Sequence, residues 1–231
     1  MVKLILFSVL AVMSLALPLS LIFTSGTKPK IPWILLGAGY YLTANLILNL
    51  LKNAWMMKLE PLGAMLFYLI ITVITWTLTA SLFFRRLSAA KSGKISLIYG
   101  GYAMINTFVA SMVSYSPLIQ YGLLSVSGQT DQIPAEAAAL LHSAYSTIQA
   151  ADIVLAIIEL LFVFLIIAQL FSILLTGKGP RRFIEFAAGL FAYMLIQYGQ
   201  WGTGVSFIAY GAILAGLVVI GKRERIRLTR V

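Results

Sequence analysis

Long apolar runs, bounded by charged or loop-forming residues, recur along the whole chain. A run of about 20 apolar residues is long enough to cross a bilayer as a helix, and a lipid-exposed strand could not satisfy its backbone polar groups there. This criterion predicts seven membrane-spanning helices, at about residues 4–24, 33–51, 62–84, 95–116, 153–176, 183–201 and 204–221. The sequence therefore predicts an all-α, polytopic transmembrane helix bundle that forms a single domain over residues 1–231.

The first apolar run follows Lys3, as the apolar core of a signal peptide would. It is longer than the usual core of about 7–15 residues, and no small-x-small cleavage site closes it. We interpret the run as a retained membrane helix, with cleavage as the alternative.

The second run, "LLGAGYYLTANLILNLLKN", carries a line of polar and small residues within an otherwise apolar helix. Residues four apart lie on one helix face, and this spacing joins Gly37, Tyr41, Asn45, Asn49 and Asn53. Buried asparagines commonly hydrogen-bond to a neighbouring membrane helix, so the first interpretation is a packing face with Asn45 and Asn49 buried. The alternative is one wall of a polar cavity or solute path.

The fourth run repeats this spacing, with Tyr102, Asn106, Ala110 and Ser114 again four residues apart. We expect the two asparagine-bearing faces to meet. The last run, "YGAILAG", pairs small residues at the same spacing, Gly211 with Ala215 and Ala212 with Gly216, and such pairs let two helices approach closely.

The fifth run contains Glu159, the one carboxylate well inside a predicted span, and Gln169 further along the same helix. A carboxyl group inside a membrane is by default a candidate functional site. No Lys, Arg or His lies within the predicted spans to pair with it, so a protonated structural carboxyl is the alternative. Gln169 is either part of a polar vestibule or an ordinary interfacial residue.

Between the fourth and fifth runs the chain has a long connection without Lys or Arg. Pro117 is expected to end or kink the fourth span, residues 125–134 are expected to form a loop, and an Ala-rich amphipathic helix is predicted at about residues 134–150. This helix would lie on the membrane surface or cap the bundle, through an apolar face made of Leu140, Leu141, Tyr145 and Ile148. The single histidine, His142, is expected to be a surface residue rather than a metal ligand.

Basic residues alternate between the two sides of the predicted bundle. The connections after the first, third and fifth runs, together with the C-terminal tail, hold fourteen of the 17 basic residues: Lys28, Lys30, Arg85, Arg86, Lys91, Lys94, Lys178, Arg181, Arg182, Lys222, Arg223, Arg225, Arg227 and Arg230. Because cytoplasmic loops are enriched in Lys and Arg, we expect the N-terminus outside and the C-terminus in the cytoplasm of a multi-pass cell-membrane protein. The formal net charge of +10 then predicts contact with anionic lipid headgroups rather than with nucleic acid.

Composition supports the membrane interpretation and excludes several chemistries. The chain is 61% hydrophobic and 10% charged, and its mean hydropathy is +0.96. It has no cysteine and one histidine, which rules out disulfides, thiolate nucleophiles and multi-histidine metal centres within it. It lacks a Walker loop, an HExxH and a GxSxG sequence, and we predict no cofactor and no catalytic or metal-binding residues.

The hydrophobic layout resembles one known family, the YhfC-type intramembrane metalloproteases, which are distant relatives of the CAAX prenyl proteases. The resemblance covers about two thirds of the chain, through three stretches, "LPLSLIFTSGTKPKIPWILLGAGYYLTANLIL", "LIYGGYAMIN" and "IIELLFVFLIIAQLFSILL". It implies a membrane helix bundle. It also implies that Tyr102 and Asn106 stand where the family has a metal-binding His and Glu, and that Glu159 and Leu160 stand where it has Glu-Arg.

Two further family features are missing from this sequence. The third-helix Glu-Glu pair is replaced by "ITVITWTL", and the final histidine has no counterpart in "FAYMLIQYG". The resemblance therefore implies a degenerate member without the metal ligands and without protease chemistry.

Three functions remain open at this point. The first is a non-catalytic subunit or accessory protein of a larger membrane complex, with other membrane-protein subunits as partners. The second is a small transporter or permease component whose polar path is lined by the second, fourth and fifth runs, and the third is an intramembrane enzyme of unfamiliar design. The candidate polar positions are Asn45, Asn49, Tyr102, Asn106, Glu159 and Gln169.

Overall fold

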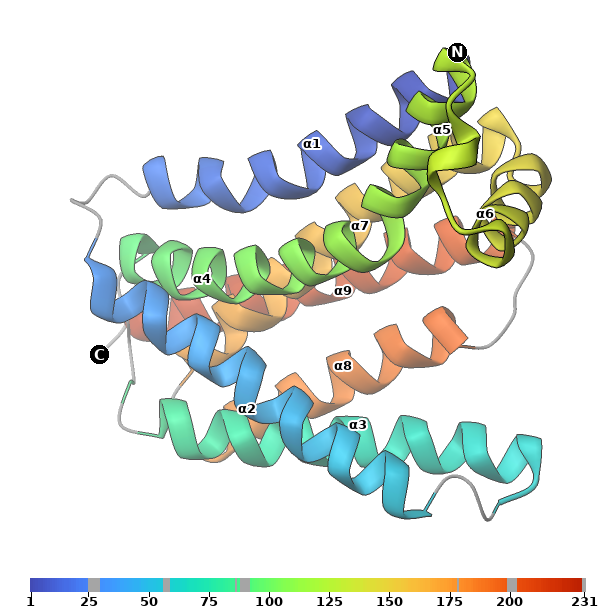
Figure 1. Ribbon diagram of the computed structural model, residues 1–231. Helices are drawn as coiled ribbons and strands as arrows, with labels where there is room; N and C mark the ends of the chain where they lie inside the picture. Colours follow the sequence, from blue (N-terminus) through green and yellow to red (C-terminus); the bar gives the residue numbers. More distant parts are fainter. Residues whose placement is uncertain are drawn as a thin grey trace.

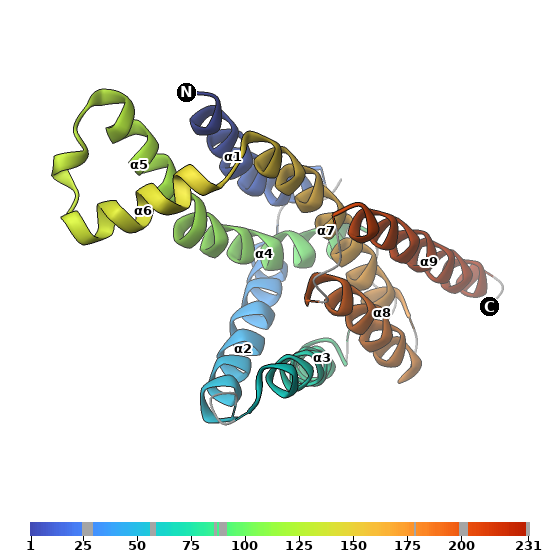
Figure 2. The same ribbon diagram turned by 90° about the vertical axis from the view of Figure 1, so that its right-hand side faces the viewer.

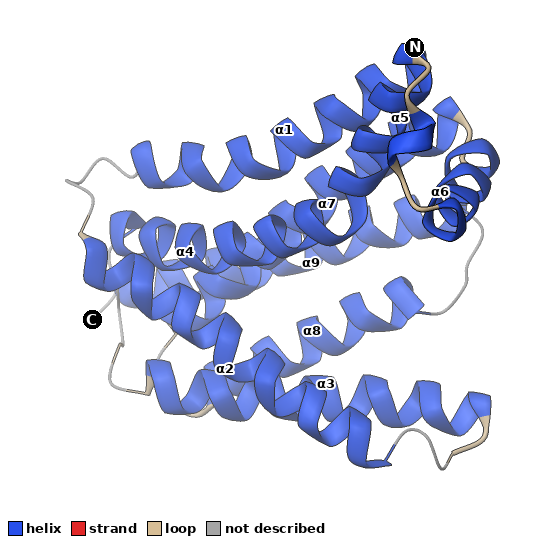
Figure 3. Ribbon diagram, in the orientation of Figure 1, coloured by secondary structure: helices blue, strands red, loops and turns tan. Residues whose placement is uncertain are grey.

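The computed structural model describes residues 1–24, 30–55, 59–85, 87, 92–177, 179–198 and 203–229, and all of its regular elements are helical (Figure 3). They are α1 (Val2–Phe23), α2 (Ile31–Trp55), α3 (Pro61–Phe84), α4 (Ser92–Ala110), the π-helix η2 (Ser111–Tyr115), α5 (Ser116–Ser127), the 3-10 helix η3 (Thr130–Gln132), α6 (Ala135–Thr147), α7 (Ala150–Thr176), α8 (Arg181–Tyr198) and α9 (Thr203–Thr229). The predicted all-α fold is confirmed.

The long helices run side by side and alternate in direction between two ends of a bundle (Figure 1). One end carries α5 and α6, and we call it the α6 end; the other carries the C-terminus of the chain, and we call it the C end. In the end view α4 packs against α1 and α2, α7 packs against α1, α8 and α9, and α3 joins α2 to α8 (Figure 2). Helices α2, α3, α8, α7 and α4 thereby surround the centre of the bundle.

Six helices in the described part of the chain are long and apolar enough to cross a membrane: Val2–Phe23, Ile31–Ala54, Gly63–Phe84, Gly93–Ser127, Ala150–Thr176 and Gly204–Gly221. The predicted span at 183–201 corresponds to α8, which is not among them because its 18 residues include Arg181, Arg182 and Glu185. Residues 199–201 lie outside the described part. The structure therefore supports six apolar helices, and the seventh span remains a prediction.

The outer faces of these helices are apolar. On α2, Leu42, Leu46 and Leu50 are 55%, 63% and 64% exposed, and large apolar side chains are also exposed on α1 and α3. A water-soluble monomer rarely exposes contiguous apolar surface of this extent. The bundle therefore fits a multi-pass membrane protein. Several basic residues behind the orientation prediction lie outside the described residues: Lys28, Lys58, Arg86, Lys91, Lys178 and Arg230.

The fourth predicted span is longer and less regular than expected. The helix passes from α4 through η2 into α5, changes direction, and ends only at Gly128, whose φ is 70°. Pro117 lies in the first turn of α5, a position where proline is tolerated. The expected break is thus a kink at a π-helix, an element that often occurs at functional sites.

Glycines bring α2 and α4 into direct backbone contact. A methyl group built on Gly37 would lie 1.8 Å from the carbonyl oxygen of Ile98, and one on Gly101 would lie 2.0 Å from that of Ile34. Only glycine can occupy such positions, so these two residues set the crossing of the two helices. The small residues predicted to serve this purpose in the last run make no such contact within the described residues, because a methyl group built on Gly211 or on Gly216 would meet no described atom within 4 Å.

Two buried phenols anchor helices to the backbone of a neighbouring helix. The Tyr40 hydroxyl donates to the carbonyl oxygen of Trp76 at 3.0 Å, and the Tyr99 hydroxyl donates to that of Phe164 at 2.6 Å. The Tyr40 side chain is 0% exposed, and its ring contacts the Trp76 ring edge-on at 5.4 Å. Each buried hydroxyl is thereby satisfied while its ring fills the core.

Helix α6 caps the α6 end of the bundle. Lys3 donates to the carbonyl oxygens of Tyr145 at 3.0 Å and Ser146 at 3.2 Å, in the last turn of α6, where a cation interacts favourably with the helix dipole. Tyr145 and Ile148 pack against α1, α5 and α7 as predicted. Leu140 does not, since it is 70% exposed; it lies more than one turn before Tyr145, beyond the surface of the bundle that α6 covers.

Candidate functional site

A cavity of about 190 Å³ lies between α2, α3, α4, α7 and α8. We call it the central cavity. Its volume corresponds to about six water molecules at their share of liquid volume. It is lined by Asn45, Leu48, Tyr68, Thr72, Trp76, Tyr102, Asn106, Val163, Ile167, Leu190, Tyr193, Met194 and Tyr198.

The central cavity brings together three of the six candidate positions predicted from the sequence. Asn45 comes from α2, and Tyr102 and Asn106 come from α4. The Asn45 amide donates to the carbonyl oxygen of Tyr41 in its own helix at 3.1 Å, and the Asn106 side chain forms no hydrogen bond with another described residue. The amides therefore do not bind each other, and both line the same space.

Asn49, the next residue of the predicted line, is exposed instead of buried. A helix turns by about 100° per residue, so a line of every fourth residue drifts by about 40° at each step. Asn49 thus lies about 120° around the helix from Gly37, which is in the contact with α4. The face that stays buried is one residue back, at Tyr40, Ala44 and Leu48.

Five aromatic side chains complete the lining, and four of them were missed in the sequence. Tyr68 and Trp76 come from α3, and Tyr193 and Tyr198 come from α8. The Tyr68 and Tyr198 rings meet edge-on at 5.2 Å, and the Trp76 and Tyr102 rings meet at 5.5 Å. Tyrosine and tryptophan in the middle of apolar runs were the available signal, because each carries a polar group that needs a partner.

The aromatic edge of the cavity nearest the α6 end carries a positive charge. The Lys52 ammonium lies 5.6 Å from the centre of the Tyr68 ring, near the end of α2. Such an arrangement is a cation–π contact. Lys52, Tyr68 and Tyr198 therefore form an amphipathic rim at this edge of the central cavity.

Glu159 lies outside the lining, in a separate polar cluster. Its carboxylate Oε1 is 2.9 Å from the hydroxyl of Tyr210 on α9, and the same hydroxyl is 2.8 Å from Oε1 of Gln197 on α8. Tyr210 is 2% exposed. Its ring lies 6.4 Å from that of Tyr193, which lines the cavity, so the cluster and the cavity share one wall.

Gln169 is not part of this arrangement. It lies on α7 closer to the C end, where its side-chain oxygen would be 3.8 Å from a methyl group built on Gly221 of α9. The structure thus places it at a helix–helix contact, away from the cavity and from Glu159.

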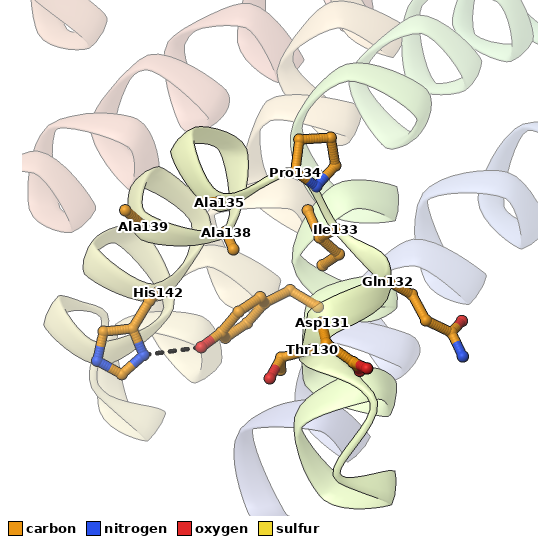
Figure 4. Close-up of a pocket in the computed structure, with 10 residues that line it drawn as sticks. Thr130, Asp131, Gln132, Ile133, Pro134, Ala135, Ala138, Ala139 and His142 are labelled. Atoms are coloured by element: carbon orange, nitrogen blue, oxygen red, sulfur yellow. Dashed lines mark hydrogen bonds between the residues drawn. The ribbon is translucent and has the colours of Figure 1, made fainter.

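A second, larger hollow of about 770 Å³ lies at the surface between α5, η3 and α6 (Figure 4). Nδ1 of His142 lies 2.7 Å from the Tyr121 hydroxyl, within hydrogen-bond distance, while His142 itself is exposed. Asp131 and Thr130 also line the hollow. The rest of its lining is Gln132, Ile133, Pro134 and three alanines, so it offers fewer polar side chains than the central cavity does.

Arg182 has a structural role that the sequence did not reveal. It is 3% exposed, and its guanidinium donates to the carbonyl oxygens of Phe84 at 2.7 Å, Leu87 at 2.8 Å and Arg85 at 3.0 Å. Phe84 and Arg85 close α3 and Leu87 follows it, and the last carbonyls of a helix accept no hydrogen bond within the helix itself. The Phe84 carbonyl also accepts from the backbone N–H of Leu87 at 3.0 Å. Burial lowers the pKa of Arg182, but a guanidinium keeps its charge in proteins. The side chain thereby ties the end of α3 to the start of α8.

The described residues contain no group of three or more His, Asp or Glu side chains that could hold a metal ion. The fold and the cavity fit a multi-pass membrane helix bundle with a polar and aromatic interior cavity. No protein family, curated protein or solved structure matches the chain, so the resemblance to YhfC-type proteases stays a prediction.

Proposed function

We propose that this chain is a small multi-pass membrane protein that binds a small polar solute in the central cavity, as a transporter or permease component. One observation carries this proposal: the amides of Asn45 and Asn106, from two helices, line a single cavity without pairing with each other across it. Tyr102 and Tyr193 line the same cavity, while Tyr68 and Tyr198 bond to each other at its rim, hydroxyl to hydroxyl at 3.5 Å. Polar groups in a membrane bundle normally find partners on adjacent helices. Here their remaining hydrogen-bonding capacity faces a space large enough for a small molecule.

The lining indicates what kind of solute would bind. Asn45 and Asn106 supply both donors and acceptors, and the rings of Trp76 and Tyr102 supply flat apolar faces. The described lining contains no charged side chain, and only Lys52 lies at its rim. We therefore propose a compact solute with hydroxyl, amide or ammonium groups, held by hydrogen bonds and ring contacts rather than by an ion pair.

The experiment compares ligand-induced stabilisation of purified protein with that of two asparagine variants. Glycerol, glucose, glycine betaine and a mixture of amino acids serve as probes, and a probe at 100 times its Kd stabilises the folded state by about 2.7 kcal/mol. We expect Asn106→Leu to abolish the stabilisation and the matched control Asn49→Leu, at an exposed position, to retain it. An equal loss in both variants, or stabilisation of wild type and Asn106→Leu alike, contradicts the proposal.

We also propose that α8 crosses the bilayer, which makes seven spans, with the N-terminus outside and the C-terminus in the cytoplasm of the cell membrane. In support, α8 packs between α3 and α7 as the spanning helices do, and its two arginines lie at the C end, together with Arg85 and Lys94. Basic residues at that end would face the anionic headgroups of the inner leaflet.

Single cysteines test this topology, because the chain has none of its own. Thr24 ends α1 at the C end, Gln129 follows α5 at the α6 end, and Gly204 begins α9. With seven spans, a membrane-impermeant maleimide added to intact cells labels Gln129→Cys and Gly204→Cys and spares Thr24→Cys. Protection of Gly204→Cys together with Thr24→Cys would mean that α8 does not cross.

A separate observation favours a second function, that of a subunit in a larger membrane complex. An apolar groove of about 420 Å³ runs between α8 and α9 and is lined by residues that include Ala192, Ala209 and Ala212. A methyl group built on Gly211 or Gly216, on α9, would meet no described atom within 4 Å, and small residues of this kind commonly admit a partner helix. Purification in mild detergent tests this function: a stable larger assembly that Ala212→Leu disperses would support it, and a monomer that copurifies with nothing would oppose it.

A further inference from the structure

The cluster of Glu159, Tyr210 and Gln197 has one hydroxyl hydrogen and two neighbouring acceptor oxygens. The Tyr210 hydroxyl lies 2.9 Å from Glu159 Oε1 and 2.8 Å from Gln197 Oε1. A phenol donates a single hydrogen, so it can bond to one of these oxygens only. The second contact requires that the partner donate to the Tyr210 oxygen.

Two complete hydrogen-bond patterns meet this requirement, one for each protonation state of Glu159. With Glu159 protonated, its O–H donates to Tyr210, and Tyr210 donates to the Gln197 carbonyl. With Glu159 ionised, Tyr210 donates to the carboxylate, and the Gln197 amide turns so that its NH₂ group donates to Tyr210, since the two ends of an amide are nearly identical in shape. The cluster can therefore gain or lose a proton without leaving a buried polar group unpaired.

No cation neutralises Glu159 within the described residues. The ionisable groups around it are phenols: Tyr210 from α9, Tyr193 from α8 and Tyr115 from η2. On the other helices packed against α7, the basic side chains are engaged elsewhere, since Lys3 of α1 donates to the end of α6 and Lys94 of α4 lies over the Trp33 ring. An unpaired carboxylate is costly inside a membrane. Protonation removes this charge, and the cluster does not have to enlarge to accept a proton.

We propose that Glu159, Tyr210 and Gln197 form a reversible proton-binding site whose protonation state is transmitted to the central cavity by Tyr193. Gln197 is exposed in the last turn of α8, so the site has access to the surface at the α6 end. Tyr193 contacts the Tyr210 ring on one side and lines the cavity on the other. The proposed proton site does not depend on the proposed solute function. Its transmission to the cavity through Tyr193 rests on that function.

Infrared difference spectra of the full chain in lipid nanodiscs, recorded between acidic and alkaline pH, test the proton site. We expect a carbonyl band of a protonated carboxylic acid that is lost in Glu159→Gln and shifted in Tyr210→Phe, which removes the hydroxyl and keeps the ring. The control Glu185→Gln, at a carboxylate that pairs with Arg181 at 2.7 Å, retains the band. A band that persists in Glu159→Gln, or that does not shift in Tyr210→Phe, overturns the proposal.

Trp76 reports on the cavity side, because it is one of four tryptophans in the chain and lines the cavity. In a variant that keeps only Trp76, with the other three changed by Trp33→Phe, Trp55→Phe and Trp201→Phe, its emission should shift over the pH range of the infrared band. Glu159→Gln should remove this shift, and Tyr193→Leu should remove it while leaving the infrared band. An invariant Trp76 emission overturns the transmission to the cavity. The solute-binding assay at a single pH fails or succeeds independently of both results.

Discussion

Replacing Arg182 with methionine should destabilise the bundle strongly, although the change lies at its end. The substitution keeps most of the aliphatic volume and removes the donors to the carbonyl oxygens of Phe84, Arg85 and Leu87, which lie at 2.7, 3.0 and 2.8 Å. The Phe84 carbonyl also accepts from the backbone N–H of Leu87 at 3.0 Å, so the substitution leaves two carbonyls, those of Arg85 and Leu87, without this donor. An unpaired carbonyl costs about 1–3 kcal/mol when buried. Because both contacts are only partly buried and the desolvation cost of the guanidinium also disappears, we take the lower figure for each and expect a loss of about 2 kcal/mol.

Arg182→Lys should give an intermediate loss of about 1 kcal/mol, because an ammonium is a point charge and cannot reproduce the planar donor fork. The matched control is Arg181→Met at the adjacent position. Arg181, whose side chain is 62% exposed, pairs with Glu185 one helical turn away, and helical pairs at this spacing contribute about 0.3–0.5 kcal/mol.

The measurement is equilibrium unfolding of the purified protein in mixed micelles by increasing detergent denaturant, followed by tryptophan fluorescence. Each variant is compared with wild type at the same lipid-to-detergent ratio. The reasoning fails if Arg182→Met costs less than about 1 kcal/mol, the range of substitutions without a specific structural role, or if Arg181→Met costs as much as Arg182→Met.

Two further substitutions test the contacts that hold the helices together. Gly101→Ala should abolish the folded monomer in size-exclusion chromatography, because the new methyl group would lie 2.0 Å from the Ile34 carbonyl oxygen, whereas Gly211→Ala, with no described neighbour within 4 Å, should leave the elution unchanged. Tyr99→Phe removes the hydrogen bond to the Phe164 carbonyl and should lower the unfolding free energy by about 1 kcal/mol; an unchanged midpoint of unfolding would show that this bond adds nothing to stability.

The helices could be predicted from the sequence because length and apolarity decide them locally. The long apolar runs matched helices to within a few residues, apart from the fourth, which continues through η2 to Ser127, and the last, whose helix continues past residue 221 to Thr229. The orientation of each helix about its axis was harder to predict. Asn45 and Asn106 do reach a common cavity, but Asn49 turns away, because regular spacing of four drifts around a helix of 3.6 residues per turn.

The parts of the site that were missed depend on contacts between distant segments. Tyr68 and Tyr198 are 130 residues apart in the sequence, and nothing local to either indicates that their rings meet. In the sequence, Arg182 does not differ from the other basic residues of a charged connection. Its role is visible only in the structure, where the end of α3 lies beside it. The same holds for Tyr210, whose hydroxyl acquires meaning from Glu159 on another helix.

The backbone contact between α2 and α4 has a mechanical consequence for the cavity. The two helices touch at Gly37 and Gly101 and separate toward the α6 end (Figure 1), so this contact acts as a fulcrum. Asn45 lies eight residues beyond Gly37, or about 12 Å along the axis at 1.5 Å per residue. A tilt of α2 by about 5° about that fulcrum moves Asn45 by about 1 Å over this lever arm. The width of the central cavity is therefore controlled from a point outside its lining.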